Sequence, residues 1–208
     1  PIIETYDRYI ETWWFLVNLT ECYHNAKLFR WYLNAFIQSL RNATFVLQSE
    51  KNKIPNFDKW YSEQQERMRN NSLLKSFVEG RNIVVKRGML ESKSTAITGI
   101  FIFTDSTELL EKAKSFLIGF LIDEEHSAID EQIGIERKWI VELIGDDEIV
   151  SLCHKAWISI GKILEDAHLL FKYEFVYPEF EIEKLPSKQI LLETDLDPKL
   201  PHKWDSIS

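Results

Sequence analysis

The sequence predicts a mainly α-helical protein: a four-helix bundle with a small α/β insertion and an extended C-terminal tail. Over four long stretches, apolar residues recur every three or four positions, which is the period of an α-helix. Residues 133–143 instead alternate apolar and polar side chains, which is typical of a β-strand. The 208 residues include 7 Gly and 6 Pro, too few for an all-β fold with many turns.

The first two helical stretches follow one another without a helix-breaking residue. Residues 2–20 carry an apolar stripe in which Ile3, Trp13 and Val17 recur at helical spacing. Residues 21–49 are apolar on nearly every side, which places this helix at the centre of the bundle. No Gly or Pro separates the two stretches, so the pattern predicts either two helices or one long kinked helix.

A third helix is predicted to start at Asn56 or Asp58, either of which can cap it, and to end at Gly88. Arg81 projects from the middle of one apolar arc of this helix. The side chains that share the arc are Leu73, Leu74, Phe77, Val78, Val84 and Val85. A guanidinium on an apolar face costs free energy unless it is paired. We therefore expect Arg81 to belong to a structural ion pair, an interface or a functional site.

The α/β insertion is predicted between the third and fourth helices, over residues 93–145. Its first part, 95–104, is rich in β-forming residues, and a helical run to Leu121 follows. The alternating stretch 133–143 supplies a second strand. The insertion therefore contains two strands and one helix.

The fourth bundle helix is predicted over about residues 147–171, with its turn and N-cap in 145–147. Four Pro residues follow Tyr173 and exclude long helices from the tail, which alternates apolar and acidic residues. We predict a single domain over residues 1–208, divided into the bundle (1–92 and 146–172), the insertion (93–145) and the tail (173–208).

The charge of the chain is distributed unevenly. Residues 1–93 contain 14 basic and 10 acidic side chains, whereas residues 94–208 contain 11 and 23. Seven basic and two acidic side chains lie within residues 67–93 alone. A basic segment of this kind attracts phosphate or other anions, although Lys and Arg also suit an exposed helix end.

Several features predict a cytoplasmic protein without membrane association. The longest apolar run, 116–122, is far shorter than the about 20 residues that span a bilayer. The first residues, 1–4, lack the basic and apolar regions of a signal peptide. Cys22 and Cys153 are far apart in apolar contexts, which is typical of reduced thiols in the cytosol.

Arg81-Asn82 lies near the end of a predicted bundle helix, and Lys86 follows within the next turn and a half. An Arg, a polar residue and then a His a few positions on form the motif of the HEPN superfamily. This segment resembles that motif, with Lys86 at the position of the His. The resemblance covers residues 3–87 and 147–171 and implies a helical bundle that forms a homodimer. It also implies a metal-independent ribonuclease of a defence or toxin system, without a cofactor.

The same resemblance implies a role for each residue of the motif. Arg81 is expected to bind the phosphate of RNA or a nucleotide, Asn82 to support it by hydrogen bonding, and Lys86 to make a second phosphate contact. An ordinary Lys keeps its proton at pH 7 and is a poor general base. Binding of RNA without cleavage is therefore at least as compatible with the motif as catalysis.

Two other classes of function stay open. The first is a non-catalytic structural or protein-interaction module, in which Arg81 pairs with a buried carboxylate and the acidic tail binds a protein partner. The second is a di-metal carboxylate bundle, because Glu21–His24 and Glu165–His168 are two Glu-x-x-His pairs. The third helix offers no Glu on its apolar arc to complete such a site, so we predict neither a metal site nor a cofactor. His168 itself is read either as a hydrogen-bonded core residue or as a substitute for the missing motif His.

Overall fold

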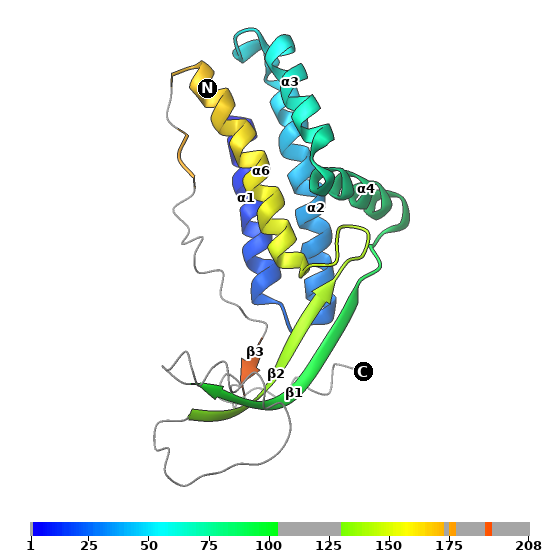
Figure 1. Ribbon diagram of the computed structural model, residues 1–208. Coiled ribbons are helices and arrows are strands. Elements are labelled where there is room, and N and C mark those ends of the chain that lie inside the picture. Colours follow the sequence, from blue (N-terminus) through cyan, green and yellow to red (C-terminus); the bar gives the residue numbers. More distant parts are fainter. Residues whose placement is uncertain (1, 104–129, 173–174, 178–189, 193–208) are drawn as a thin grey trace. The chain divides into compact units, whose positions relative to one another are not determined.

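The computed structural model describes residues 2–103, 130–172, 175–177 and 190–192 (Figure 1). The chain divides into two compact units. The first comprises residues 1–95 with 138–188, and the second comprises 96–137 with 189–208. The prediction of a single domain stays a prediction.

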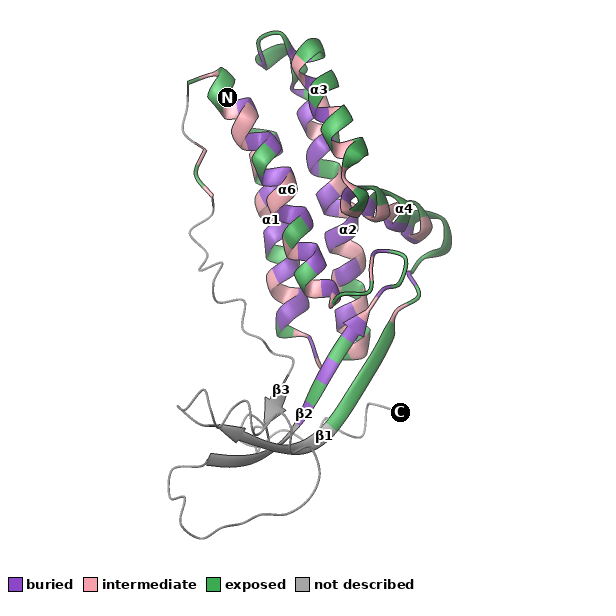
Figure 2. Cartoon of the chain, viewed as in Figure 1, coloured by how far each residue is buried: buried purple, intermediate pink, exposed green. Residues whose placement is uncertain are grey.

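The first unit is a bundle of helices. Its elements are α1 (Ile3–Glu21), α2 (Ala26–Ser49), the short η1 (Lys51–Lys53), α3 (Phe57–Asn70), α4 (Ser72–Arg87) and α6 (Ile149–Leu170). Figure 1 shows α1, α2 and α6 side by side, with α3 next to α2 and α4 crossing the bundle at a steep angle. Buried residues line the facing sides of the long helices (Figure 2). None of the helices in the described part of the chain combines the length and apolarity needed to cross a membrane.

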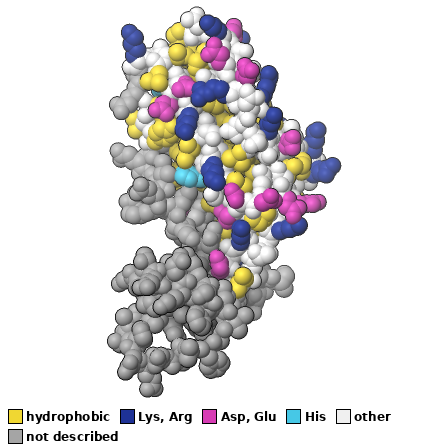
Figure 3. Space-filling model, in the orientation of Figure 1, with side chains coloured by type: hydrophobic (Ala, Val, Ile, Leu, Met, Phe, Trp, Pro, Cys, Tyr) yellow, Lys and Arg dark blue, Asp and Glu magenta, His cyan; other side chains and the backbone are white. Residues whose placement is uncertain are grey.

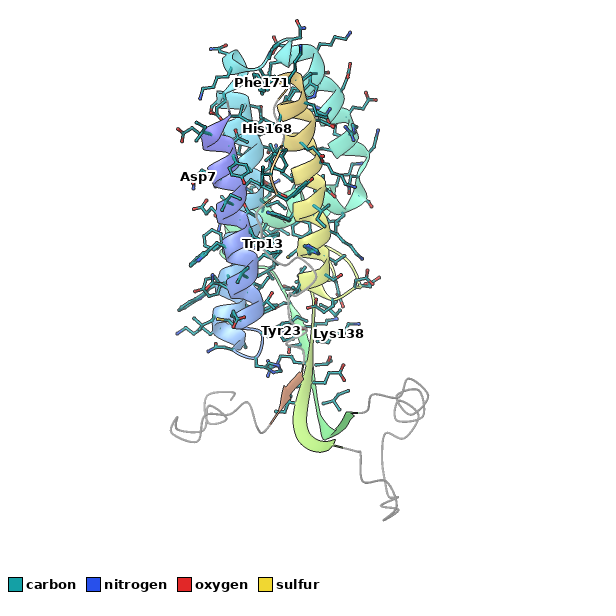
Figure 4. The ribbon with its side chains drawn as sticks, turned by 90° about the vertical axis from the view of Figure 1, so that its left-hand side faces the viewer. Asp7, Trp13, Tyr23, Lys138, His168 and Phe171 are labelled. Carbon is teal, nitrogen blue, oxygen red and sulfur yellow. The ribbon has the colours of Figure 1, made fainter. Side chains whose placement is uncertain are left out.

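An aromatic cluster forms the centre of the core between α1 and α6. The ring of Tyr9 stacks on that of Trp157 with their centroids 4.4 Å apart, and Trp13 lies 4.6 Å from Trp157. The indole N–H of Trp157 donates to the carbonyl oxygen of Tyr9 at 3.3 Å. Figure 4 shows Trp13 between the two helices. The apolar stripes that predicted these helices therefore meet in one core.

The first two stretches form separate helices, joined by a corner at residues 22–25. Asn25 caps α2, since its side-chain oxygen accepts a hydrogen bond from the backbone N–H of Leu28 at 3.1 Å. An Asn cap can start a new helix without any Gly or Pro. Of the two predicted alternatives, two helices are therefore correct.

The prediction of one continuous third helix is wrong, because the chain breaks at Asn71. The backbone of Asn71 is extended, and its side chain accepts from the N–H of Leu74 at 3.1 Å as the N-cap of α4. Asn56 precedes α3 in a left-handed conformation with φ of 53° and makes no side-chain cap bond. At the other end, Gly88 adopts φ of 89° and donates its N–H to the carbonyl of Val84 at 2.8 Å. The predicted end at Gly88 is confirmed.

The fourth predicted helix is α6, but its cap is Glu148 and not a residue of 145–147. One carboxylate oxygen of Glu148 accepts from the N–H of Ser151 at 3.0 Å. The other accepts from the hydroxyl of Tyr23, also at 3.0 Å. Burial raises the pKa of the Glu148 carboxyl. The cap therefore doubles as a tie to the corner between α1 and α2.

The strands β1 (Lys93–Phe103), β2 (Asp130–Ile140) and β3 (Ile190–Leu192) form a sheet in the order β1–β2–β3. β2 and β3 are antiparallel, with Gly134 opposite Leu192. The predicted helix up to Leu121 and most of the tail lie outside the described residues. The predicted class, mainly helical with a small insertion that contains strands, is confirmed.

Candidate functional site

The helix α4 has two apolar faces, one buried and one exposed. The buried face consists of Leu74, Phe77, Gly80 and Val84. Val78 and Val85, predicted to share this face, are instead 38% and 54% exposed. A β-carbon at Gly80 would lie 3.3 Å from Leu90, so the missing side chain allows α4 to pack closely there. The single apolar arc predicted from the sequence is therefore wider than the face that the bundle covers.

Arg81 lies at the border between these two faces. It is half-buried, and its guanidinium carbon lies 6.0 Å from the ring centroid of Phe45 on α2. Its Nε atom is buried and has no hydrogen-bond partner in the described part of the chain. Among the residues that the structure describes, no carboxylate forms an ion pair with Arg81. The structural ion pair, one of the predicted roles of Arg81, is therefore not found within this part of the chain.

A second guanidinium shares the same aromatic ring. The guanidinium carbon of Arg41 lies 4.4 Å from the centroid of Phe45, and its Nη1 donates to the hydroxyl of Thr44 at 2.9 Å. Phe45 is 43% exposed. Two cations on one ring are each attracted by its π face, but they repel one another. The arrangement therefore concentrates positive charge beside an exposed aromatic side chain.

A cleft of about 410 Å³ opens where α2, α3, α4 and α6 meet. We call it the α2–α4 cleft. Its buried lining is mostly apolar and consists of Ile37, Leu40, Thr44, Tyr61, Leu74, Phe77 and Ile160. Its remaining lining includes the charged residues Arg41, Arg69, Lys75 and Glu79. Val78 also lines the cleft and so connects it to the exposed face of α4. The cleft combines an apolar interior with a predominantly basic border.

Apolar and charged side chains alternate on the same side of the bundle. Figure 3 shows Lys and Arg interspersed with apolar side chains over α3 and α4. Arg67 is paired, since its Nη1 donates to a carboxylate oxygen of Asp166 at 2.6 Å. Within the described ranges, neither Arg69 nor Lys75 forms an ion pair. In the described part of the chain, the basic segment predicted from the sequence therefore contains cations, such as Arg69 and Lys75, that no carboxylate neutralises in an ion pair.

The structure does not bring the three predicted site residues together. Asn82 and Lys86 are exposed, whereas Arg81 is half-buried. Arg81 and Lys86 are five residues apart on α4, which separates them by about 140° around the helix. The roles assigned to these residues stay predictions that no contact in the structure tests.

The structure bears on the two alternatives for His168 and on the predicted di-metal site. The Nδ1 of His168 lies 2.8 Å from the carbonyl oxygen of Leu164, and its ring contacts that of Phe175 at 5.0 Å. Figure 4 places His168 near the C-terminal end of α6. Throughout the described ranges, no three His, Cys, Asp or Glu side chains gather in a way that could hold a metal ion. The two Glu-x-x-His pairs therefore do not form a site there.

Sequence reasoning missed His154, which lies on α6 against the aromatic cluster. Its ring is 6.1 Å from that of Trp13 and stacks on Trp157 at 6.5 Å. Its Nε2 is buried and has no hydrogen-bond partner among the residues that the structure describes, and burial lowers the pKa of the imidazole. No motif surrounds His154; the only available signal was a titratable residue at the edge of an apolar stripe.

A second group of exposed aromatic side chains lies on α1 and on the N-terminal half of α2. Trp14 on α1 is 54% exposed, and its ring contacts that of Tyr32 with their centroids 6.2 Å apart. Trp31 on α2 is also exposed, and the ammonium of Lys27 lies 4.9 Å from the centroid of its ring. None of these side chains lines the α2–α4 cleft.

Comparison with known proteins identifies the family. The family model described as bacteriophage lambda protein ea47 matches residues 3–180. Protein ea47 of Escherichia phage lambda is 31% identical over 170 residues, which cover 71% of this chain and 39% of the relative. The chain thus spans well under half of that relative's length. No solved structure matches the chain.

These matches overturn the resemblance to the HEPN superfamily. The predictions of RNA binding and of ribonuclease activity depended on that resemblance and are wrong with it. The physical reason is that an Arg followed by Asn on a bundle helix is a short pattern, and this chain contains three Arg-Asn pairs. Helical periodicity supports any bundle equally and adds no specificity. The match over residues 3–180 shows that the chain belongs to the bacteriophage lambda protein ea47 family.

Proposed function

We propose that this chain is a non-catalytic protein-interaction module. Its docking surface consists of Phe45, Val78, Arg81 and Val85, which we call the α4 surface. The observation that supports the proposal is the second, exposed apolar face of α4. Val78 and Val85 are seven residues apart and therefore lie within about 20° of one another around the helix. A seven-residue apolar spacing is the one at which a helix packs along a partner helix.

The composition of the α4 surface also suits an interface. Interfaces are enriched in aromatic residues and Arg, and their most important contacts join such residues to apolar neighbours. Here Phe45 is flanked by Arg41 and Arg81, and α4, which carries Arg81, also exposes Val78 and Val85. Exposed apolar side chains in a contiguous group mark binding sites more often than isolated ones do.

The proposal is tested by selecting ligands from a display library of helical peptides with randomised surface positions. The target is the full chain, and the disrupting variant is Val78→Gln/Val85→Gln, because Gln keeps a good helix propensity. We expect selected peptides whose affinity falls by about tenfold or more in this variant, which corresponds to about 1.4 kcal/mol.

The matched control is Trp14→Gln/Trp31→Gln, which removes two exposed apolar side chains outside the α4 surface. Peptides selected on the wild type are expected to bind this control unchanged. Thermal unfolding of both variants verifies that they are folded. Failure to select any peptide, or selection only of peptides that need the two Trp residues, contradicts the proposal. The predicted homodimer and the predicted role of the acidic tail stay predictions.

A further inference from the structure

We infer that the partner of the α4 surface is an acidic amphipathic helix, which places an apolar side chain in the α2–α4 cleft and carboxylates against Arg41 and Arg81. The inference rests on the proposed function and specifies the chemistry of the partner. It follows from the shape of the cleft, the balance of charge around it and the state of the two guanidiniums.

The cleft favours an apolar side chain. Its volume of about 410 Å³ falls within the range of about 300–1,000 Å³ that is usual for ligand sites. Most side chains that line its interior, including Leu40, Leu74 and Phe77, are buried and apolar. The hydroxyls of the two buried polar residues, Thr44 and Tyr61, already donate to the backbone carbonyl oxygens of Arg41 and Thr44. A polar group placed among them loses its hydration without gaining a hydrogen bond. An apolar side chain of a partner has no hydrogen bonds to water to lose, and its burial in the cleft removes apolar surface from water.

The border of the cleft favours negative charge. Three cations, Arg41, Arg69 and Lys75, line it together with one carboxylate, Glu79. In the part of the chain that the structure describes, none of the three cations is in an ion pair. A basic partner helix would meet like charges at close range, and like charges facing one another disfavour an interface. An acidic partner gains attraction at the same positions.

The two guanidiniums beside Phe45 give the most specific indication. Their carbon atoms lie 4.4 and 6.0 Å from one ring centroid, so two positive charges share a partly buried site. The Nε of Arg81 is buried, and its N–H finds no acceptor among the described residues. A carboxylate near both guanidiniums neutralises their repulsion and accepts charge-assisted hydrogen bonds, which are the strongest that Arg makes. Within the part of the chain that the structure describes, no carboxylate supplies the counter-charge that this pair requires.

A helical partner fits better than an extended one. α4 spans 16 residues, so its exposed face is about 24 Å long. Val78 and Val85 are separated by two helical turns along this face, which suits apolar residues at seven-residue spacing in a partner helix. An extended strand would need an exposed sheet edge to satisfy its backbone groups, and the α4 surface is formed by helices alone.

The experiment uses two helical-peptide libraries with the same apolar stripe. Flanking positions are limited to Asp, Glu, Gln and Ser in the acidic library, and to Lys, Arg, Gln and Ser in the basic one. Both are selected against the full chain, and affinities are measured by fluorescence anisotropy at low and high ionic strength. A single-stranded RNA of mixed sequence, labelled with fluorescein, is the competing probe.

We expect binders from the acidic library, with an affinity that decreases as salt is added. Arg41→Gln/Arg81→Gln is expected to weaken them by about tenfold or more, as for loss of a charge-assisted contact. Arg8→Gln/Arg30→Gln removes two Arg residues elsewhere and is expected to leave the affinity unchanged. Thermal unfolding verifies that both variants are folded.

Equal binding from the basic library overturns the inference, and so does binding that does not depend on Arg41 and Arg81. Displacement of the peptide by the RNA probe at lower concentration also overturns it, since it indicates a phosphate site. The proposed function then still stands if the unrestricted library yields peptides that need Val78 and Val85. It fails separately if that library yields none.

Discussion

The hydroxyl oxygen of Tyr9 lies well inside van der Waals distance of the place where a β-carbon of residue 161 would stand. Gly161 is thus a position at which α6 lies directly against a side chain of α1, and the ring of Tyr177 closes the same space at 2.9 Å. Because Tyr9 is fully buried and stacked on Trp157, it has no room to move away. The absence of a side chain at Gly161 therefore sets the distance between the two helices.

Gly161→Ala is expected to destabilise the protein by about 1–3 kcal/mol, because the added methyl group overpacks the core. This occurs although Ala favours a helix over Gly by about 1 kcal/mol. The midpoint of thermal unfolding checks the loss. The control is Gly80→Ala, whose β-carbon meets the flexible end of Leu90 at 3.3 Å and lies at ordinary contact distance, 3.8 Å, from Ile144. A midpoint for Gly161→Ala at or above that of the wild type would show that the helices can separate freely.

Arg81→Met is expected to leave the free energy of unfolding unchanged or to raise it. The substitution removes a buried Nε that has no hydrogen-bond partner, and an unsatisfied buried donor costs about 1–3 kcal/mol. Urea unfolding measures the change. The comparison is Arg67→Met, which breaks the ion pair with Asp166 and should lose up to about 1 kcal/mol. A loss greater for Arg81→Met than for Arg67→Met would mean that Arg81 stabilises the bundle itself.

Val84 and Val85 are neighbours with opposite environments, which allows a matched test of how α4 is oriented. Val84 is 5% exposed and Val85 is 54% exposed. Val84→Ala is expected to cost about 1–3 kcal/mol through lost burial, whereas Val85→Ala should stay within about 0.5 kcal/mol. Chemical denaturation of both variants gives the two values. Similar losses at the two positions would place α4 in a different rotation about its axis.

Asn71→Ala is expected to lower the free energy of unfolding by about 1 kcal/mol, because α4 loses the acceptor of its N-cap bond. The preceding residue, Asn70, is exposed and supplies the control, since it ends α3 and caps nothing. Asn70→Ala should change stability by less than about 0.5 kcal/mol. Circular dichroism during urea unfolding follows both variants. An effect of equal size at the two positions would argue against the break at Asn71.

His154 is expected to make the protein less stable as the pH falls below about 6.5, the ordinary pKa of the imidazole. Burial lowers the pKa of His154 in the folded state, so the unfolded chain binds its proton first. The free energy of unfolding therefore rises with pH between the folded and unfolded pKa values, and the full contribution is present above about 6.5.

The measurement is the difference in unfolding free energy between the wild type and His154→Gln as a function of pH. Taking a difference cancels other groups, such as Glu148, whose raised pKa acts in the opposite direction. The variant should lose less stability than the wild type between about pH 6.5 and pH 5. Parallel curves for the two proteins would show that His154 keeps its ordinary pKa after folding.

Periodicity in the sequence predicted the long helices because their buried faces follow the bundle closely. α1, α2 and α6 each have one stripe in the core, and Gly88 ends α4 through its own conformation. The break at Asn71 was missed because no Gly or Pro marks it. An Asn cap needs only one side-chain bond to start a new helix.

The site was harder to predict than the fold, because it depends on residues that are distant in sequence. A helical wheel shows which residues of α4 share an arc, but not which part of that arc a neighbour covers. The contact of Arg81 with Phe45 joins two helices, and the cap of α6 by Glu148 involves Tyr23, which is 125 residues away. Neither contact leaves a local pattern. A short motif such as Arg81-Asn82 therefore suggested a site that the family assignment does not support.

The tie between Tyr23 and Glu148 bears on how the chain folds and on how the family can vary. The α1–α2 hairpin joins residues that are nearer in sequence, such as Thr5 and Glu50, than those that tie α6 to it, such as Tyr23 and Glu148. The hairpin is therefore expected to form early. Closing the intervening loop becomes only about 0.6 kcal/mol more costly with each doubling of its length. Because the tie holds α6 at its first residue, relatives can lengthen or shorten the segment between α4 and α6 while the same three-helix packing assembles around it.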